Sequence, residues 1–133
     1  MGRIEDTRYL LDTHTAIWYF SGNNRLSETA NRIMQDTSSP LYLSIASAWE
    51  VAIKIGIGKL NIDGKAAGFI RLAELNKITI LPIETAYLTA LESLPQIHRD
   101  PFDRLLVATA LAEGLTIITA DENIAMYPVS HIR

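Results

Sequence analysis

The 133-residue sequence has no cysteine and no long apolar run. Without cysteine the chain can form no disulfide, no thiolate nucleophile and no cysteine-ligated zinc or iron–sulfur site. Its apolar stretches fall short of the roughly 20 residues that a membrane-spanning helix needs. The first residues carry mixed charge rather than the apolar core of a signal peptide. We therefore expect a cytoplasmic protein with no membrane segment.

The sequence also lacks an excess of basic side chains. Twelve Lys and Arg residues against fifteen Asp and Glu residues leave a formal charge of −3, so composition alone does not indicate a broad nucleic-acid-binding face. The apolar content of 48% is that of an ordinary globular protein. A chain of this length can bury a core of its own. We expect a single domain over residues 8–133, preceded by an N-terminal tail over residues 1–7.

Short apolar runs alternate with segments of helical periodicity along the whole chain. The predicted strands cover residues 9–11, 41–43, 78–81, 115–119 and 129–132. The predicted helices cover residues 13–20, 27–39, 44–55, 65–76, 84–94, 100–113 and 123–127. This alternation predicts an α/β fold in which helices cover both faces of a mostly parallel sheet.

Two aspartates stand at the carboxyl ends of predicted strands, where α/β folds bind their ligands. Asp12 directly follows the first apolar run, and Asp121 follows residues 117–120. Each could instead serve only as a helix cap, because aspartate is a common cap residue. Thr13 and Thr119 flank the two aspartates, and their hydroxyls could orient a carboxylate or act as turn residues.

Two further acids lie on predicted helices. Glu50 is surrounded by apolar residues, and a carboxylate buried there would need a cationic partner or a metal. An ion pair with Lys54, one turn later, is the structural alternative. Asp103 lies three residues after Asp100, which we interpret as the helix cap, so Asp103 could simply favour the helix dipole.

Together these strands and helices could deliver four carboxylates to one edge of the sheet. Close carboxylates repel one another and raise one another's pKa values, and a divalent cation relieves that repulsion. Oxygen donors without cysteine suit Mg²⁺ or Mn²⁺. With Asp12, Glu50, Asp103 and Asp121 set aside for such a site, the other eleven acids nearly balance the twelve basic residues.

Four stretches, in order, resemble the PIN-domain ribonucleases, and more narrowly the VapC-type toxins of type II toxin–antitoxin pairs. The stretches are Tyr9-Leu10-Leu11-Asp12-Thr13-His14, Ser47-Ala48-Trp49-Glu50-Val51-Ala52-Ile53-Lys54 with Gly58-Lys59-Leu60, His98-Arg99-Asp100-Pro101-Phe102-Asp103-Arg104-Leu105-Leu106-Val107-Ala108, and Thr119-Ala120-Asp121. Each is weakly specific alone, and the ordered set spans nearly the whole chain.

The resemblance implies a PIN-like three-layer α/β/α fold and metal-dependent endonucleolytic cleavage of RNA. It assigns catalysis and binding of Mg²⁺ or Mn²⁺ to Asp12, Glu50, Asp103 and Asp121. It also implies a homodimer and a cognate antitoxin. The alternative is a non-catalytic PIN-like module that binds RNA or protein, against which the intact acids argue.

Several basic and aromatic residues near these motifs remain open between two roles. Lys54, Lys59, Arg99 and Arg104 could contact RNA phosphates or could instead form a solvated face or pair with nearby acids. The acid Asp100 could support the site from behind, although we interpret it as the helix cap. His14 and His98 are interpreted as surface or capping groups. Trp18 and Trp49 could stack a base, but their helical spacing among apolar residues favours core packing, most of all for Trp49.

Overall fold

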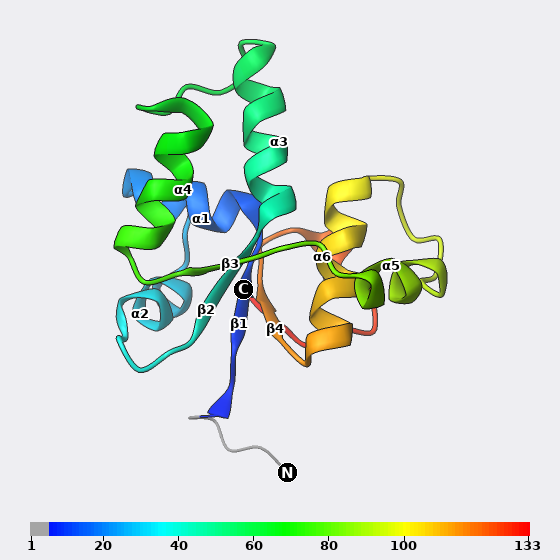
Figure 1. The fold of residues 1–133 in the computed structure, drawn as a ribbon. Coiled ribbons are helices and arrows are strands. Elements are labelled where there is room, and N and C mark those ends of the chain that lie inside the picture. The colour runs from blue at the N-terminus through cyan, green and yellow to red at the C-terminus, as the bar shows by residue number, and fades with distance from the viewer. Residues whose placement is uncertain (1–5) are drawn as a thin grey trace.

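A computed structural model describes residues 6–133, so residues 1–5 of the predicted tail lie outside the described part of the chain. The chain forms a five-stranded sheet with helices on both sides (Figure 1). In chain order the elements are β1 (Tyr9–Leu11), α1 (Thr13–Ser21), α2 (Glu28–Gln35), β2 (Leu41–Ser44), α3 (Ile45–Gly56), α4 (Lys65–Leu75), β3 (Thr79–Leu81), α5 (Thr85–Glu92), α6 (Pro101–Glu113), β4 (Thr116–Ile118), α7 (Glu122–Ala125) and β5 (His131–Ile132).

The strand order β3-β2-β1-β4-β5 places β1 at the centre, and every pairing is parallel. The last residue of β1, Leu11, lies in register with Leu43 of β2 and Ile118 of β4. After β1 the chain moves to one side of the sheet, and β4 later pairs with the other side of β1. The carboxyl ends of β1 and β4 therefore form the topological switch point, where α/β sheets bind ligands.

Side chains of the central strands alternate between two apolar layers. Leu11 of β1 and Ile118 of β4 pack with α1–α4, whereas Leu10 and Ile117 pack with α6 and α7. All four are almost inaccessible to solvent, because a parallel sheet must be covered on both faces. Figure 1 shows α1, α2 and α4 on one side of the strands and α5 and α6 on the other. The predicted three-layer α/β/α fold is confirmed.

Local sequence signals placed most helix starts correctly. Ser27, Ser44 and Asp100 cap α2, α3 and α6 as their side chains accept backbone N–H groups. The other ends differ from the prediction by a few residues, because terminal turns depend on tertiary contacts; α5, for example, covers Thr85–Glu92 rather than residues 84–94. No helix of residues 6–133 is long and apolar enough to cross a membrane.

Helix α3 departs from the prediction, because one of its faces is open to solvent. Trp49, expected in the core, is 59% exposed, and Ile53 and Ile57 one and two turns later are 41% and 62% exposed. Only the opposite face, which includes Glu50 and Val51, is buried. The expectation for Trp49 was wrong because the buried face could not be identified from a helix that is apolar all round. The Trp49 ring instead packs edge-on against the Phe102 ring, with ring centroids 5.1 Å apart.

Candidate active site

Asp12 connects the end of β1 to the start of α1. Its Oδ1 accepts the backbone N–H of His14 at 2.7 Å, which caps α1, and its Oδ2 accepts the Thr119 hydroxyl at 2.6 Å. The side chain is almost fully buried. Burial raises the pKa of Asp12, although the hydrogen bonds from Thr119 and His14 oppose that rise. Asp12 is thus a helix cap and, at the same time, a buried acid at the switch point.

Thr119 links Asp12 to the second strand-end aspartate, Asp121. The Thr119 hydroxyl donates to Asp12 and accepts the backbone N–H of Asp121 at 2.9 Å. Asp121 Oδ1 in turn accepts the N–H groups of Asn123 and Ile124 and caps the short helix α7. The buried hydroxyl of Thr119 therefore sets the relative positions of the two acids.

Glu50 reaches the same edge from α3. Its Oε1 accepts the Thr13 hydroxyl at 2.8 Å, and its Oε2 lies 2.9 Å from Lys54 Nζ. Thr13 is also hydrogen-bonded to the Ser47 hydroxyl at 2.8 Å. Since Thr13 directly follows Asp12, this hydroxyl pair ties α3 to the end of β1. Glu50 is buried, as predicted, and the ion pair with Lys54 is also present.

Asp103 lies in the first turn of α6 and has the most perturbed environment of the four acids. Burial is the largest cause that raises its pKa to about 7, and the negative charges of Asp100, Asp121 and Asp12 add to the rise. A hydrogen bond from His98 opposes it. The electrostatic effect of Asp12 and Asp121 on Asp103 indicates that Asp103 lies in their neighbourhood.

A row of hydrogen-bonded polar side chains next to Asp103 was not predicted from the sequence. His98 Nε2 lies 3.2 Å from Asp103 Oδ2, and His98 Nδ1 lies 2.8 Å from the buried Tyr127 hydroxyl. Arg104 donates to the same hydroxyl at 3.0 Å and to the Pro95 carbonyl at 2.9 Å. Because N–H groups already point at the hydroxyl oxygen, its proton is directed at Nδ1. This favours the imidazole tautomer whose Nε2–H donates to Asp103.

His98 is therefore a partner of Asp103 rather than the surface or capping group expected. No motif marked Tyr127, which comes from the chain after α7 and meets His98 only in the folded protein. The other predicted basic residues divide into two groups. The charges of Lys54 and Arg104 are directed to Glu50 and to the Tyr127 and Pro95 oxygens, whereas Lys59 and Arg99 are exposed. Asp100 caps α6 through the N–H groups of Phe102 and Asp103.

The donor chemistry of this edge fits a hard divalent cation, because its acids offer only oxygen ligands. Within residues 6–133, however, no three acidic or imidazole side chains lie close enough together to enclose a metal ion. Here Asp12 and Asp121 cap helices, and Glu50 pairs with Lys54. A carboxylate has about four acceptor sites, so these contacts leave oxygen lone pairs free for a cation.

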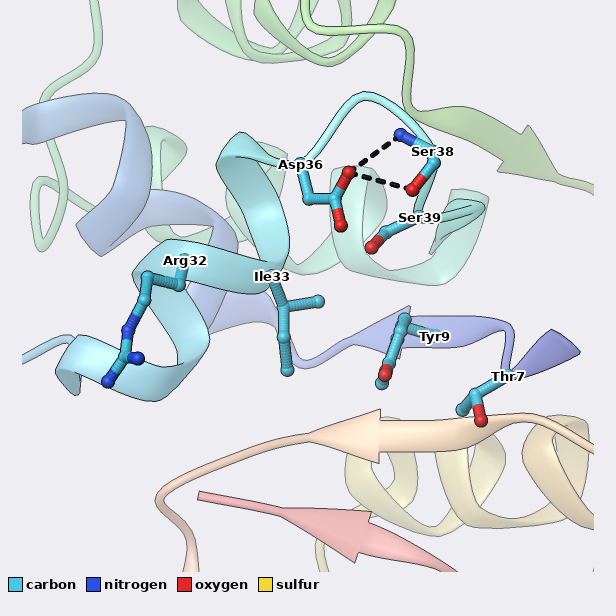
Figure 2. Close-up of a pocket in the computed structure, with 7 residues that line it drawn as sticks. All are labelled: Thr7, Tyr9, Arg32, Ile33, Asp36, Ser38 and Ser39. Atoms are coloured by element: carbon cyan, nitrogen blue, oxygen red, sulfur yellow. Dashed lines mark hydrogen bonds between the residues drawn. The ribbon is translucent and has the colours of Figure 1, made fainter. Parts of the chain in front are cut away.

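A cavity of about 350 Å³ lies at the end of the sheet opposite to these acids, near the starts of β1 and β2. Figure 2 shows Tyr9, Arg32 and Asp36 along its wall. The Asp36 carboxylate there accepts the backbone N–H and the hydroxyl of Ser38, at 3.0 and 2.7 Å, while the Arg32 side chain points away from it. This cavity brings together no buried acids, so its size does not make it the candidate site.

Comparisons with known proteins agree with this geometry. The family model described as "PIN domain" matches residues 9–129. Ribonuclease VapC22 of Mycobacterium tuberculosis (strain ATCC 25618 / H37Rv) is 29% identical over 120 residues, which cover 89% of this chain and 90% of that protein.

Solved structures show the same fold at lower identity. A structure of VapBC2 from Rickettsia felis bound to a DNA fragment from their promoter has a TM-score of 0.69 and 14% identity, and covers 95% of this chain and 98% of the other. DNA-bound VapBC from Salmonella typhimurium has a TM-score of 0.66 and 19% identity, and covers 96% and 97%. At these identities the likeness concerns the fold.

Proposed function

The chain belongs to the PIN domain family, and from this we propose that it is an endoribonuclease that hydrolyses RNA phosphodiester bonds as the toxin of a toxin–antitoxin pair. The observation that carries the proposal is the set of buried and half-buried acids near the switch point of the sheet, where burial and neighbouring negative charges raise the pKa of Asp103 to about 7. The ribonuclease activity named for the 29%-identical relative supports it. We expect the protein to act in the cytoplasm.

We further propose that Mg²⁺ or Mn²⁺ is held by Asp12, Glu50, Asp103 and Asp121. Such a cation, when bound, neutralises the charge that develops on the scissile phosphate and lowers the pKa of water. The chain's own groups prepare the site. Thr119 orients Asp12, Thr13 orients Glu50, and His98 orients Asp103, each through one hydrogen bond. Such supporting partners tune acidic sites in proteins.

The attacking water must lose a proton to a nearby carboxylate, for which we propose Asp12 or Asp121. Both lie beside the pocket that opens at this edge, with a volume of about 220 Å³. Since the raised pKa of Asp103 leaves that group partly protonated near neutral pH, it is less suited to accept a proton before a cation binds. The non-catalytic alternative is not favoured, because all four acids are present and three are supported by side-chain hydrogen bonds.

The test is cleavage of a defined RNA by the purified protein in Mn²⁺, in Mg²⁺ and in EDTA. We expect fragments with either metal and intact RNA in EDTA. Cleavage that persists in EDTA would contradict the metal role, and RNA binding without cleavage in every buffer would support the non-catalytic alternative.

We also propose two protein partners, an antitoxin and a second copy of this chain. The exposed apolar stripe on α3, formed by Trp49, Ile53 and Ile57 at four-residue spacing, supports a contact of this kind. Ile57→Glu would place a charge on the stripe. We expect this variant to weaken association, measured as a lower mass by light scattering or a loss of the co-expressed antitoxin; unchanged values for both would contradict a role for the stripe.

A further inference from the structure

The pocket beside Asp12 and Asp121 has a second wall that is not acidic. This wall is formed by His14 and Trp18 of α1, by Arg25 in the segment that follows α1, and by Ala120. The His14 and Trp18 rings lie one helical turn apart, with centroids at 5.9 Å and planes tilted by 43°. The pocket thus joins the buried Asp12 and the partly exposed Asp121 to two aromatic rings and one guanidinium.

Trp18 differs from its neighbours on α1 in what it contacts. Ile17, Tyr19 and Phe20 pack against the apolar cluster between the sheet and α1–α4, whereas Trp18 belongs to none of the apolar clusters of residues 6–133. Its half-buried indole lines this pocket and an adjoining hollow beside Thr119 and Ala120. A tryptophan that lines cavities rather than filling the core presents an aromatic surface to a ligand.

We propose that this pocket receives a nucleobase of the RNA substrate, stacked on Trp18, while the phosphate of the same or the adjoining nucleotide lies at the acids. This inference rests on the proposed function. The ribose joins base and phosphate at short range, so a phosphate beside Asp12 and Asp121 places a base within reach of the same pocket. Every base has a π face that stacks on an aromatic side chain. The Arg25 guanidinium adds a cation for a phosphate oxygen or for stacking.

The pocket chemistry favours RNA over a protein segment as the occupant. The aromatic pair and the guanidinium on one wall suit a base and a phosphate oxygen, and the acids on the other wall would meet the phosphate through the divalent cation proposed for them. Stacking also tolerates all four bases, so the pocket strengthens binding without requiring one base. We expect purines, with their larger rings, to bind more tightly than pyrimidines.

A direct test uses the intrinsic fluorescence of Trp18. The chain has two tryptophans, so Trp49→Phe leaves Trp18 as the sole tryptophan, which is excited selectively over the tyrosines, and Trp18→Leu leaves Trp49 as the matched control. Each variant is titrated with adenosine 5′-monophosphate and with ribose 5-phosphate in Mg²⁺ buffer. We expect the nucleotide, and not the sugar phosphate, to quench Trp18. Equal responses to the two probes, or no quenching, would overturn the proposal.

A kinetic test uses a short RNA substrate. Loss of one stacked base predicts that Trp18→Leu raises KM about 5- to 150-fold with a smaller change in kcat, and that Trp18→Phe keeps KM near the wild-type value. Arg25→Gln, at an exposed position that does not endanger folding, should also raise KM. Wild-type KM in both Trp18→Leu and Arg25→Gln would overturn the proposal, as would a loss of antitoxin binding alone, which would assign the pocket to a protein.

The two levels of the hypothesis fail separately. If the wild-type protein cleaves no RNA but the nucleotide still quenches Trp18, base binding is supported and the proposed nuclease function is contradicted. If the wild-type protein cleaves RNA in Mg²⁺ and Trp18 neither responds to the nucleotide nor affects KM, the base pocket is contradicted and the nuclease function stands.

Discussion

Asp36 and Asp12 use the same local chemistry at opposite ends of the sheet, with opposite consequences. Each carboxylate accepts one backbone N–H and one hydroxyl, from Ser38 at one end and from His14 and Thr119 at the other. The bonds to Ser38 lower the pKa of Asp36, which is exposed, whereas burial raises the pKa of Asp12. Hydrogen bonds position an acid, and burial among other charges makes it a candidate for chemistry.

The strongest test of the difference between Asp12 and Asp36 is to neutralise each aspartate in turn. Asp12→Asn keeps the size of the side chain and can still cap α1, so we expect the fold to persist and RNA cleavage to fall by about 100-fold or more. Asp36→Asn should cleave RNA at the wild-type rate. Initial cleavage rates in Mn²⁺, with circular dichroism melts as a check on folding, measure both. Equal rates for the two variants would remove Asp12 from the site.

The pH dependence of stability provides a second contrast, centred on Asp103. Its pKa is about 7 in the folded protein against an ordinary value of 3.8 for an aspartate, so the folded state binds the proton more tightly than the unfolded state. Stability should therefore be highest below about pH 4 for this group and fall as the pH rises toward 7. The shift in pKa corresponds to a loss of at most about 4 kcal/mol in the free energy of unfolding, in the absence of a cation.

Urea unfolding in EDTA at pH 5 and pH 8 measures this loss. Asp103→Asn cannot ionise, so we expect it to lose less stability than the wild type between the two pH values. Asp36, whose pKa is lowered, should show the opposite sign and lose its contribution only as the pH falls through that lowered pKa. The same pH response in the wild type and in Asp103→Asn would show that Asp103 is not the group responsible.

The smallest effect is expected from a change in the hydrogen-bonded side chains next to Asp103. Tyr127→Phe keeps the buried ring but removes the hydroxyl that meets His98 and Arg104. We expect a loss of about 1–2 kcal/mol in stability, because the Arg104 donor and the His98 Nδ1 acceptor lose their partner, and about a 10-fold loss in cleavage. Nitrogen chemical shifts of His98 report its tautomer. If the wild-type imidazole carries its proton on Nδ1 alone, the proposed donation from Tyr127 to His98 and from His98 to Asp103 is wrong.

Much of the fold could be predicted because local signals repeat along the chain. Ser27, Ser44 and Asp100 cap their helices, and Gly114 ends α6 with a positive φ of 69°. The pattern of apolar runs predicted strands buried on both faces, and parallel pairing follows from that pattern. The match of residues 9–129 to the PIN domain model agrees with the motif resemblance.

The environment of each acid could not be predicted in the same way. Asp12, Glu50, Asp103 and Asp121 were candidates from their positions on strands and helices, but Asp12 and Asp121 also cap helices, and no sequence pattern separates those roles. The raised pKa of Asp103 depends first on its burial and then on the charges of other acids, of which Asp12 lies far away in the chain. Trp49, expected in the core, lies on the open face of α3, which only packing could decide.

By itself, the absence of cysteine excluded thiolate chemistry, and the order of the motifs indicated the family and the alternation of strands and helices. Local properties of that kind are carried by each residue and its near neighbours. The tertiary structure alone decided that Tyr127 meets His98, that Thr119 bridges Asp12 and Asp121, and that Trp18 lines a pocket. Those contacts join segments that are distant in sequence. Their strength depends on burial, which exists only in the folded protein.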